Sequence, residues 1–170
     1  MFVPCQSGDN LRKGLPMEKA KVFAAFIATK MSRIDDMKGA LEGTRQEVID
    51  SPGSNKSHSD TSRFQYSNLA LGIEGSVAEA EYALALARAL PQGPFGAVWP
   101  GCFFALKDVG SGEVSYYLFV MEGGGDSFEV DGKEVMTISN NAPLVTSVRG
   151  KKKGELARFR ERILEVLDVQ

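Results

Sequence analysis

The chain has 170 residues, of which 43% are hydrophobic and 25% are charged, and its formal net charge is −2. This composition excludes a chain that is disordered throughout, and so small a charge gives no general attraction to nucleic acid or to anionic membranes. No stretch approaches the ~18 apolar residues of a membrane span, and Cys5 and Cys102 form no disulfide framework, so we expect a cytoplasmic protein without membrane contacts or direct sequence-specific nucleic acid binding.

Residues 1–16 contain Pro4, Gly8, Gly14 and Pro16 but no periodic apolar pattern. Proline and glycine interrupt regular elements, and a terminal segment without an apolar face has nothing to bury. We therefore predict a flexible extension at 1–16.

A seven-residue apolar repeat runs from Met17 to about Asp50. Its first row is Ala20, Ile27, Ile34, Leu41 and Val48, and its second row is Phe23, Met37 and Thr44, with Lys30 as an interruption. This is the spacing of a coiled-coil seam. At ~1.5 Å per residue, the predicted helix is about 50 Å long.

A second helix follows after a polar loop. Pro52 and Gly53 end the first helix, and Ser59 or Asp60 can cap the second, which runs to about Leu90. Its apolar residues alternate at spacings of four and three: Tyr66, Ala70, Ile73, Val77, Ala80, Leu84 and Ala87. The seams match in length and phase. They predict an antiparallel two-helix coiled coil over 17–90, with its tip at about 51–60, that depends partly on docking against the C-terminal part.

A linker rich in proline and glycine at 91–97 separates this hairpin from a region of different texture. Short apolar runs punctuated by glycine predict four strands: Cys102–Lys107, Glu113–Met121, Phe128–Val130 and Val135–Ser139. Asp131 and Gly132 predict a tight turn. The order of elements predicts an α+β fold, in which the hairpin precedes a small antiparallel β domain over 98–170 with one short helix.

The apolar pattern at the end of this domain fits more than one secondary structure. Pro143 starts a helical turn that continues through Val148, and a basic turn follows at 151–154. Residues 156–166 then fit a helical stripe, whereas Arg162–Leu167 fits a terminal strand. Periodicity alone favours the helix slightly.

The histidine and cysteine residues of the sequence give little support for nucleophilic catalysis. His58 is the single histidine, and neither cysteine lies near it in the sequence, so a Cys/His site is not expected. The glycines at 123–125 lack the context of a dinucleotide or phosphate loop and predict a turn. We expect no cofactor bound by the protein alone.

Three carboxylates lie nearest the predicted tip: Glu47, Asp50 and Asp60. One interpretation is solvation and helix capping. The other is that a protruding tip delivers a carboxylate into a deep channel of a partner, where it completes the coordination of Mg²⁺ already held there. Arg63 is likewise either a surface cation or a group that pairs with phosphate or carboxylate.

Two segments carry recognisable motifs. In the first, Ile138-Ser139-Asn140-Asn141-Ala142-Pro143-Leu144 leads to Gly150-Lys151-Lys152-Lys153-Gly154-Glu155. This run resembles the Gre family of bacterial transcription elongation factors, in which Ile-Ser, Ser/Asn and Pro-Leu precede a small helix and a Gly-Lys-Lys-x-Gly-Asp/Glu turn. Asp60-Thr61-Ser62-Arg63 is similar to the start of the second helix in Gre-related proteins. The resemblance covers about 17–170 and implies an FKBP-like C-terminal domain that ends in a strand at Arg162–Val169.

The resemblance also implies a partner and a mechanism. In the Gre family, the C-terminal domain docks at the rim of the RNA polymerase secondary channel and the coiled coil enters it. Two acidic tip residues then hold a catalytic Mg²⁺ and activate water, so that the polymerase cleaves backtracked RNA. Asp60 matches the second acid, but Ser57 takes the place of the first. This departure weakens the case for cleavage, because one carboxylate supplies fewer ligands, and Asp50 or Glu47 replaces the missing acid only if the loop brings it close.

We therefore expect a factor, not itself an enzyme, that binds RNA polymerase, inserts its tip into the secondary channel and modulates elongation or cleavage of backtracked RNA. Asp60 is the expected ligand of a Mg²⁺ shared with the polymerase, and the expected contact residues are Ser57, His58, Arg63, Arg149, Lys151, Lys152 and Lys153. Two alternatives stay open: a regulator that blocks the channel without cleaving, and an FKBP-like domain that binds peptides or acts as a chaperone. We expect a monomer rather than a dimer.

Overall fold

The computed structural model describes residues 17–50 and 59–170, with the backbone alone at 59–62. The predicted extension at 1–16 and most of the predicted tip, 51–58, lie outside this part. Over the described ranges, no helix is long and apolar enough to cross a membrane.

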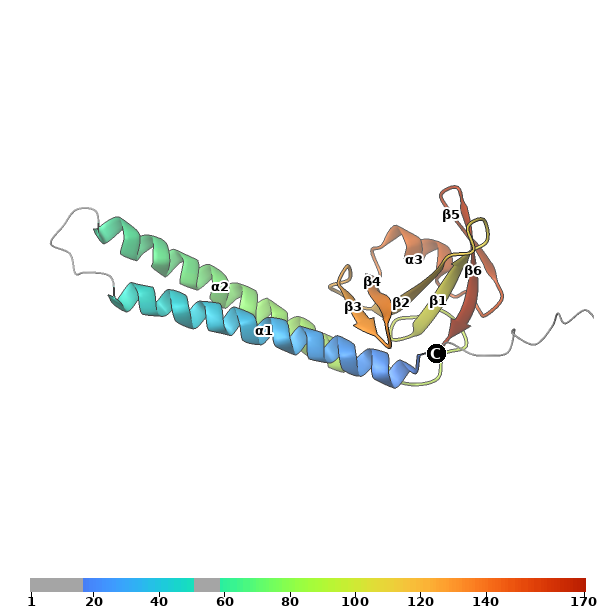
Figure 1. Cartoon of the computed structure of the whole chain (residues 1–170), viewed down its shortest axis with the longest axis horizontal. Coiled ribbons are helices and arrows are strands. Elements are labelled where there is room, and N and C mark those ends of the chain that lie inside the picture. The colour runs from blue at the N-terminus through green and yellow to red at the C-terminus, as the bar shows by residue number, and fades with distance from the viewer. Residues whose placement is uncertain (1–16, 51–58) are drawn as a thin grey trace, which may run out of the picture.

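Two long helices, α1 (Lys19–Asp50) and α2 (Ser59–Arg88), run side by side in opposite directions and project from a β domain (Figure 1). The seam between them buries residues of the predicted rows: Ile34, Leu41, Ala70, Val77, Leu84 and Ala87. Lys38 and Glu81 pair across its edge, with Nζ and Oε1 2.6 Å apart. The antiparallel two-helix coiled coil predicted from the sequence is confirmed.

At its base the hairpin turns a different face inward. Ala20, which was predicted to lie in the seam, is exposed, whereas Val22 and Phe26 are buried. The prediction for Ala20 is wrong because this part of α1 packs against the β domain as well as against α2. The heptad repeat reports only the contact between the two helices and carries no information on the contact between α1 and the sheet.

One six-stranded sheet, of order β3-β4-β2-β1-β6-β5, forms the β domain. Its strands are β1 (Phe103–Asp108), β2 (Val114–Val120), β3 (Ser127–Val130), β4 (Lys133–Ser139), β5 (Leu156–Phe159) and β6 (Arg162–Val169), and the short helix α3 (Pro143–Val148) connects β4 to β5. The neighbouring strands are antiparallel, except that β2 and β4 are parallel. The predicted α+β fold is confirmed, and the parallel pair adds to it a feature that the sequence did not indicate.

The C-terminal segment forms strands. Residues 156–166, which fit a helical stripe, contain β5 and the first half of β6, joined by a turn in which Arg160 has a φ of 55°. Leu164 and Val166 are buried, and β6 pairs with β1. The slight preference for a helix is wrong because periodicity carries no information on this distant partner strand. The strand at Arg162–Val169, expected from the resemblance, is confirmed.

The hairpin base and the sheet share one hydrophobic core. It contains Met17, Val22, Phe26, Ala87 and Leu90 from the hairpin side and Phe103, Leu118, Val120, Phe128, Val130 and Val135 from the sheet. The ring centroids of Phe26 and Phe128 lie 5.9 Å apart. A second core fills the space between the opposite face of the sheet and α3. The shared core fixes where the hairpin leaves the domain.

Polar contacts reinforce this junction. Lys30 Nζ lies 2.5 Å from Asp126 Oδ2, and Arg33 lies 3.4 Å from the other oxygen of the same carboxylate. The side-chain oxygen of Gln170 accepts a hydrogen bond of 2.9 Å from the backbone N–H of Lys19. The first half of α1 is thereby joined both to the turn before β3 and to Gln170.

Candidate functional site

The far end of the hairpin carries the first group of predicted site residues. Glu47 and Asp50 belong to the last turn of α1, and Asp60 belongs to the first turn of α2, where only the backbone is described. Ser57 and His58 lie outside the described residues. The structure therefore brings these residues to one end of the rod, and the expectation that Asp60 lacks a second acid beside it stays a prediction.

Local interactions at this end bear on Asp50. Gln46 Nε2 donates a hydrogen bond of 2.9 Å to Asp50 Oδ1, one turn along the helix. A carboxylate at a helix C-terminus is unfavourable by about 0.3–1 kcal/mol, because the partial charge of the helix there is also negative. The amide of Gln46 offsets part of this cost. Asp60, at a helix N-terminus, has the favourable position.

Apolar side chains near the tip were missed in the sequence analysis. Ile49 is 71% exposed and Phe64 is 69% exposed. Arg63, beside Phe64, is also exposed. The signal was available, since both apolar residues fall outside the predicted seam rows. The end of the rod thus presents apolar groups together with charged ones.

A complete metal site is not formed within the described part of the chain. No group of three or more His, Cys, Asp or Glu side chains is placed there to hold an ion. Asp60 offers one carboxylate, which is a hard oxygen ligand of the kind that Mg²⁺ prefers. Its role as a ligand to an ion held by a partner stays a prediction.

The second group of predicted residues surrounds the turn after α3. Gly150 has a φ of 75°, a conformation that favours glycine, and its N–H donates to the Val98 carbonyl at 2.9 Å. The N–H of Val98 in turn donates to the Lys151 carbonyl at 2.9 Å. Gly154, with a φ of 83°, donates to the Val166 carbonyl at 2.7 Å. These bonds hold the basic turn against the linker and β6.

Arg149 lies beside aromatic side chains. Its guanidinium is 5.7 Å from the centre of the Phe119 ring and donates a hydrogen bond to the Asn140 side chain. Trp99 is 49% exposed and lies next to Gly150, where an added Cβ would be 3.9 Å from Trp99 Cζ2. Trp99 is the single tryptophan, and the sequence analysis did not select it. An exposed aromatic beside basic groups suits a protein interface.

The lysines of the turn differ in their partners. Lys153 Nζ lies 3.0 Å from Asp168 Oδ1, so this ammonium already has an acidic partner within the β domain. For Lys151 and Lys152, no acidic partner is found among the described residues. These two ammonium groups are therefore the ones that a partner's carboxylates can meet without first breaking an ion pair.

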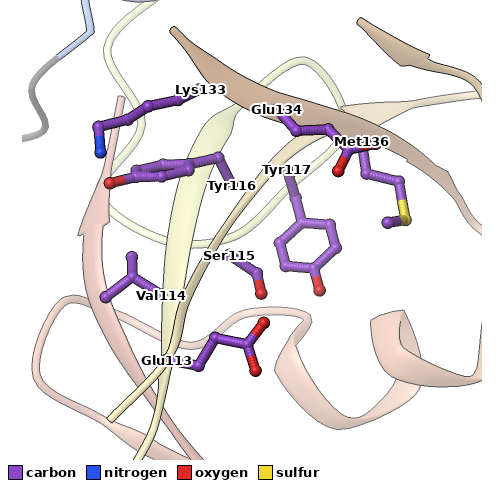
Figure 2. A pocket seen from close by; sticks show the side chains of 8 residues that line it. All are labelled: Glu113, Val114, Ser115, Tyr116, Tyr117, Lys133, Glu134 and Met136. Carbon is purple, nitrogen blue, oxygen red and sulfur yellow. The ribbon is translucent and has the colours of Figure 1, made fainter. Parts of the chain in front are cut away.

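A hollow of about 350 Å³ lies at the starts of β2 and β4 (Figure 2). Its walls are formed by Glu113, Val114, Ser115, Tyr116, Tyr117, Lys133, Glu134 and Met136. Tyr116 and Tyr117 are successive strand residues and point to different sides (Figure 2). Their rings stack instead on Phe103 and Phe104, with centroid distances of 6.3 and 5.4 Å. The two rings therefore do not converge on one ligand, as a proline-binding pocket would require.

Two buried side chains of the β domain have shifted pKa values. A hydrogen bond from Arg162, followed by bonds from the turn backbone, lowers the pKa of Asp108. Burial raises the pKa of the Cys102 thiol to about 12. Asp108 also accepts backbone N–H bonds from Gly110 and Ser111 at 2.8 and 3.1 Å, so it stabilises the turn after β1.

No protein-family model matches the chain, and no curated protein does. A solved structure described as the transcription factor Gfh1 is 18% identical, with a TM-score of 0.37, over 86% of this chain and 94% of that one. GreA factor homolog 1 of Thermus thermophilus is 18% identical, with a TM-score of 0.35, over 85% and 94%. Gfh1 of Thermus aquaticus is 16% identical, with a TM-score of 0.34, over 86% and 94%.

With TM-scores below 0.5 and identities below 25%, the likeness to these structures does not decide function. What the chain does has to follow from its own residues and geometry.

Proposed function

We propose that this chain is a Gre-like factor that binds a bacterial RNA polymerase through its β domain and places its hairpin tip in the secondary channel. The observation that carries the proposal is the reach of the hairpin. Its contacts with the β domain lie at its base, as far as Arg33 on α1. The remaining residues, 34–50, extend about 25 Å further at ~1.5 Å per residue (Figure 1).

This outer part of the hairpin contributes little to the stability of the β domain. Its buried side chains, Ile34 and Leu41, pack in the seam with α2, and two isolated helices with a narrow seam are only marginally stable in water. What the outer part provides is distance between the tip and the domain that anchors it. Such an arrangement serves a partner whose target lies at the bottom of a deep opening.

A docking surface on the β domain supports the same function. Lys151, Lys152 and Trp99 lie at the turn whose residues resemble the Gre signature, and hydrogen bonds to Val98 hold that turn in place. A rigid turn presents its cations at low entropic cost. We assign to this turn the contact with the rim of the channel, where acidic side chains of the polymerase would meet the two ammonium groups.

The tip chemistry favours occupancy of the channel over cleavage. Asp60 gives one carboxylate to a Mg²⁺ held by the polymerase, and Ser57 stands where a second acid would orient the attacking water. Without that acid the water is poorly activated. The factor has no catalytic activity of its own in this proposal, and its effect is to modulate elongation. A cytoplasmic location follows from the partner.

Competition on a stalled polymerase tests the proposal. A bacterial RNA polymerase is halted in a backtracked complex, and RNA cleavage by an authentic Gre factor is followed as this protein is added. Cleavage should slow as the protein occupies the channel. Where the protein itself stimulates cleavage, Asp60→Ala should abolish that effect and leave the competition intact.

Charge reversal identifies the docking surface. The double substitution of Lys151→Glu and Lys152→Glu should raise the concentration needed for competition at least about tenfold, a loss of ~1.4 kcal/mol. Lys133→Glu, a single charge reversal on an exposed lysine of β4, should have little effect. Absence of competition by the unmodified protein, together with unchanged elongation, would contradict the proposal.

A further inference from the structure

α2, together with Ala89 in the turn that follows it, carries a second row of heptad spacing on the face turned away from α1. Its members are Phe64, Asn68, Leu71, Gly75, Ala78, Tyr82, Ala85 and Ala89, and all of them are exposed. Their spacing alternates between four and three residues, as in the seam that packs against α1. We call these residues the outer row.

The outer row lacks the charges that a solvated helix face normally has. No member is charged, whereas the equivalent row of α1 includes Asp35 and Glu42. The exposed fractions of Phe64, Leu71 and Tyr82 are 69%, 64% and 63%. A row with coiled-coil spacing, large apolar groups and no charge is suited to packing against another helix.

We propose that the outer row binds a second copy of this chain, with the two α2 helices antiparallel. The row is self-complementary in that register. Residues then face each other in four kinds of layer: Phe64 with Ala89, Asn68 with Ala85, Leu71 with Tyr82, and Gly75 with Ala78. A bulky residue meets a small one at each end, and the small central pair lets the helices approach closely.

Packing volume favours this direction over a parallel pair. A parallel pair would place Phe64 against Phe64 and Gly75 against Gly75, which crowds one layer and leaves a void in another. An added Cβ at Gly75 meets nothing within 4 Å in the single chain. The central space is therefore open to a neighbouring helix.

The charges beside the outer row are compatible with this contact. Glu74 and Glu81 flank the row on one side and would approach their counterparts on the second copy. Arg45 pairs with Glu74, and Lys38 Nζ lies 2.6 Å from Glu81. Each carboxylate therefore has a cation of its own chain beside it, which limits the electrostatic repulsion between the glutamates of the two copies.

The area available indicates a reversible dimer. Each copy offers three large side chains that are about two-thirds exposed, and an aromatic side chain buries roughly 150–250 Å² when fully covered. With the small residues, the pair would bury on the order of 1,000 Å² in total, at the low end for specific interfaces. A dissociation constant in the micromolar range is expected, in contrast to the monomer expected from the sequence.

Sedimentation of the full chain tests the dimer. From about 1 to about 200 μM, spanning the expected dissociation constant, the average mass should rise toward twice that of one chain. Leu71→Glu should weaken association at least tenfold. Leu69→Glu should not, because Leu69 is also exposed on α2, at 53%, but lies outside the outer row. A monomer at every concentration, or equal effects of the two substitutions, would overturn the proposal.

Cysteine crosslinking tests the direction independently. In a Cys5→Ser background, Leu71→Cys and Tyr82→Cys chains should form a disulfide when mixed and not when kept apart. In the antiparallel pair, residue 71 lies opposite residue 82 of the other copy, and the two copies of residue 71 lie about 16 Å apart along the axis at ~1.5 Å per residue. Efficient crosslinking of the Leu71→Cys chain with itself would contradict the antiparallel register.

Discussion

Lys30 occupies a seam position where the coiled-coil repeat requires an apolar residue. Its side chain is 14% exposed, and its ammonium lies 2.5 Å from Asp126 and 5.6 Å from the centre of the Phe26 ring. Burying an ammonium is costly unless a carboxylate compensates it. The interruption in the repeat is therefore explained by a contact of α1 with the β domain in place of a contact with α2.

Removal of the Asp126 charge should loosen this junction. Asp126→Asn leaves the ammonium of Lys30 largely buried without its counter-charge, so the free energy of unfolding should fall by about 1–3 kcal/mol. Asp131→Asn is the matched control, because Asp131 pairs with Lys21 at 3.6 Å and both side chains are about half exposed. That change should cost less than ~1 kcal/mol. Urea unfolding measures both, and equal losses would show that the burial of Lys30 has no energetic effect.

Asp108 links stability to acid pH. Arg162 and the turn N–H groups lower its pKa in the folded state, so the ionised form favours folding. This contribution is complete above the unfolded value of about 3.9 and is lost as the pH falls through the lower folded value. Asp108→Asn should therefore be less stable than the unmodified chain at neutral pH, with a difference that shrinks below about pH 4. A difference that stays constant from pH 7 down to about pH 2 in urea unfolding would contradict this assignment.

At the scale of elements, Phe26 determines whether the hairpin is fixed to the sheet. It is 2% exposed and packs against Phe128 of β3. Phe26→Ala should reduce the free energy of unfolding by about 3–5 kcal/mol, because it removes a buried ring and leaves a cavity. Ile49→Ala, at a position 71% exposed, should stay within about 0.5 kcal/mol. Similar small losses for both would mean that the hairpin base is not part of the core.

Some elements follow from local sequence alone. The coiled-coil seam was predictable because both helices repeat the same spacing over many turns. The turn between β3 and β4 was predictable as well, since Asp131 and Gly132 have φ values of 50° and 74°, and only a few residue types favour such angles. In these cases the determining interactions lie within the segment itself.

Other elements depend on partners that are distant in the sequence. Strand β5 was not predicted, because Leu156–Phe159 becomes a strand only by pairing with β6. Of the candidate site, Arg149 and the lysines of the basic turn could be selected from the motif, but the ion pair of Lys153 with Asp168 could not. Trp99 became a candidate only when the turn placed Gly150 beside it.

At the scale of the whole molecule, the base of the hairpin anchors it to the sheet, and the outer part of the hairpin extends away from the β domain. The base of the hairpin is fixed by a core shared with the sheet and by the ion pairs of Asp126, while the ends at which α1 stops and α2 begins lie far from the β domain (Figure 1). A shared core of this kind lets the β domain set the direction of the hairpin. A factor that docks by one surface and acts through another requires this rigidity.

The proposed dimer would have a consequence for this function. Pairing through the outer row places a second hairpin along α2 and so increases the width of the rod. A channel that admits one hairpin would then exclude the pair, and binding to the polymerase would draw the equilibrium toward single chains by mass action. Concentration would thus control how much of the factor is available.

Photocrosslinking from the tip tests whether the hairpin enters the secondary channel. A photoreactive amino acid is placed at position 58 in one chain and, as a control, at the exposed Met136 in another, and each is irradiated with bacterial RNA polymerase. Position 58 should crosslink to residues lining the secondary channel, an authentic Gre factor should suppress this product, and position 136 should give no channel product. Products of position 58 on the outer surface of the polymerase, or none at saturating protein, would contradict the claim that the tip enters the channel.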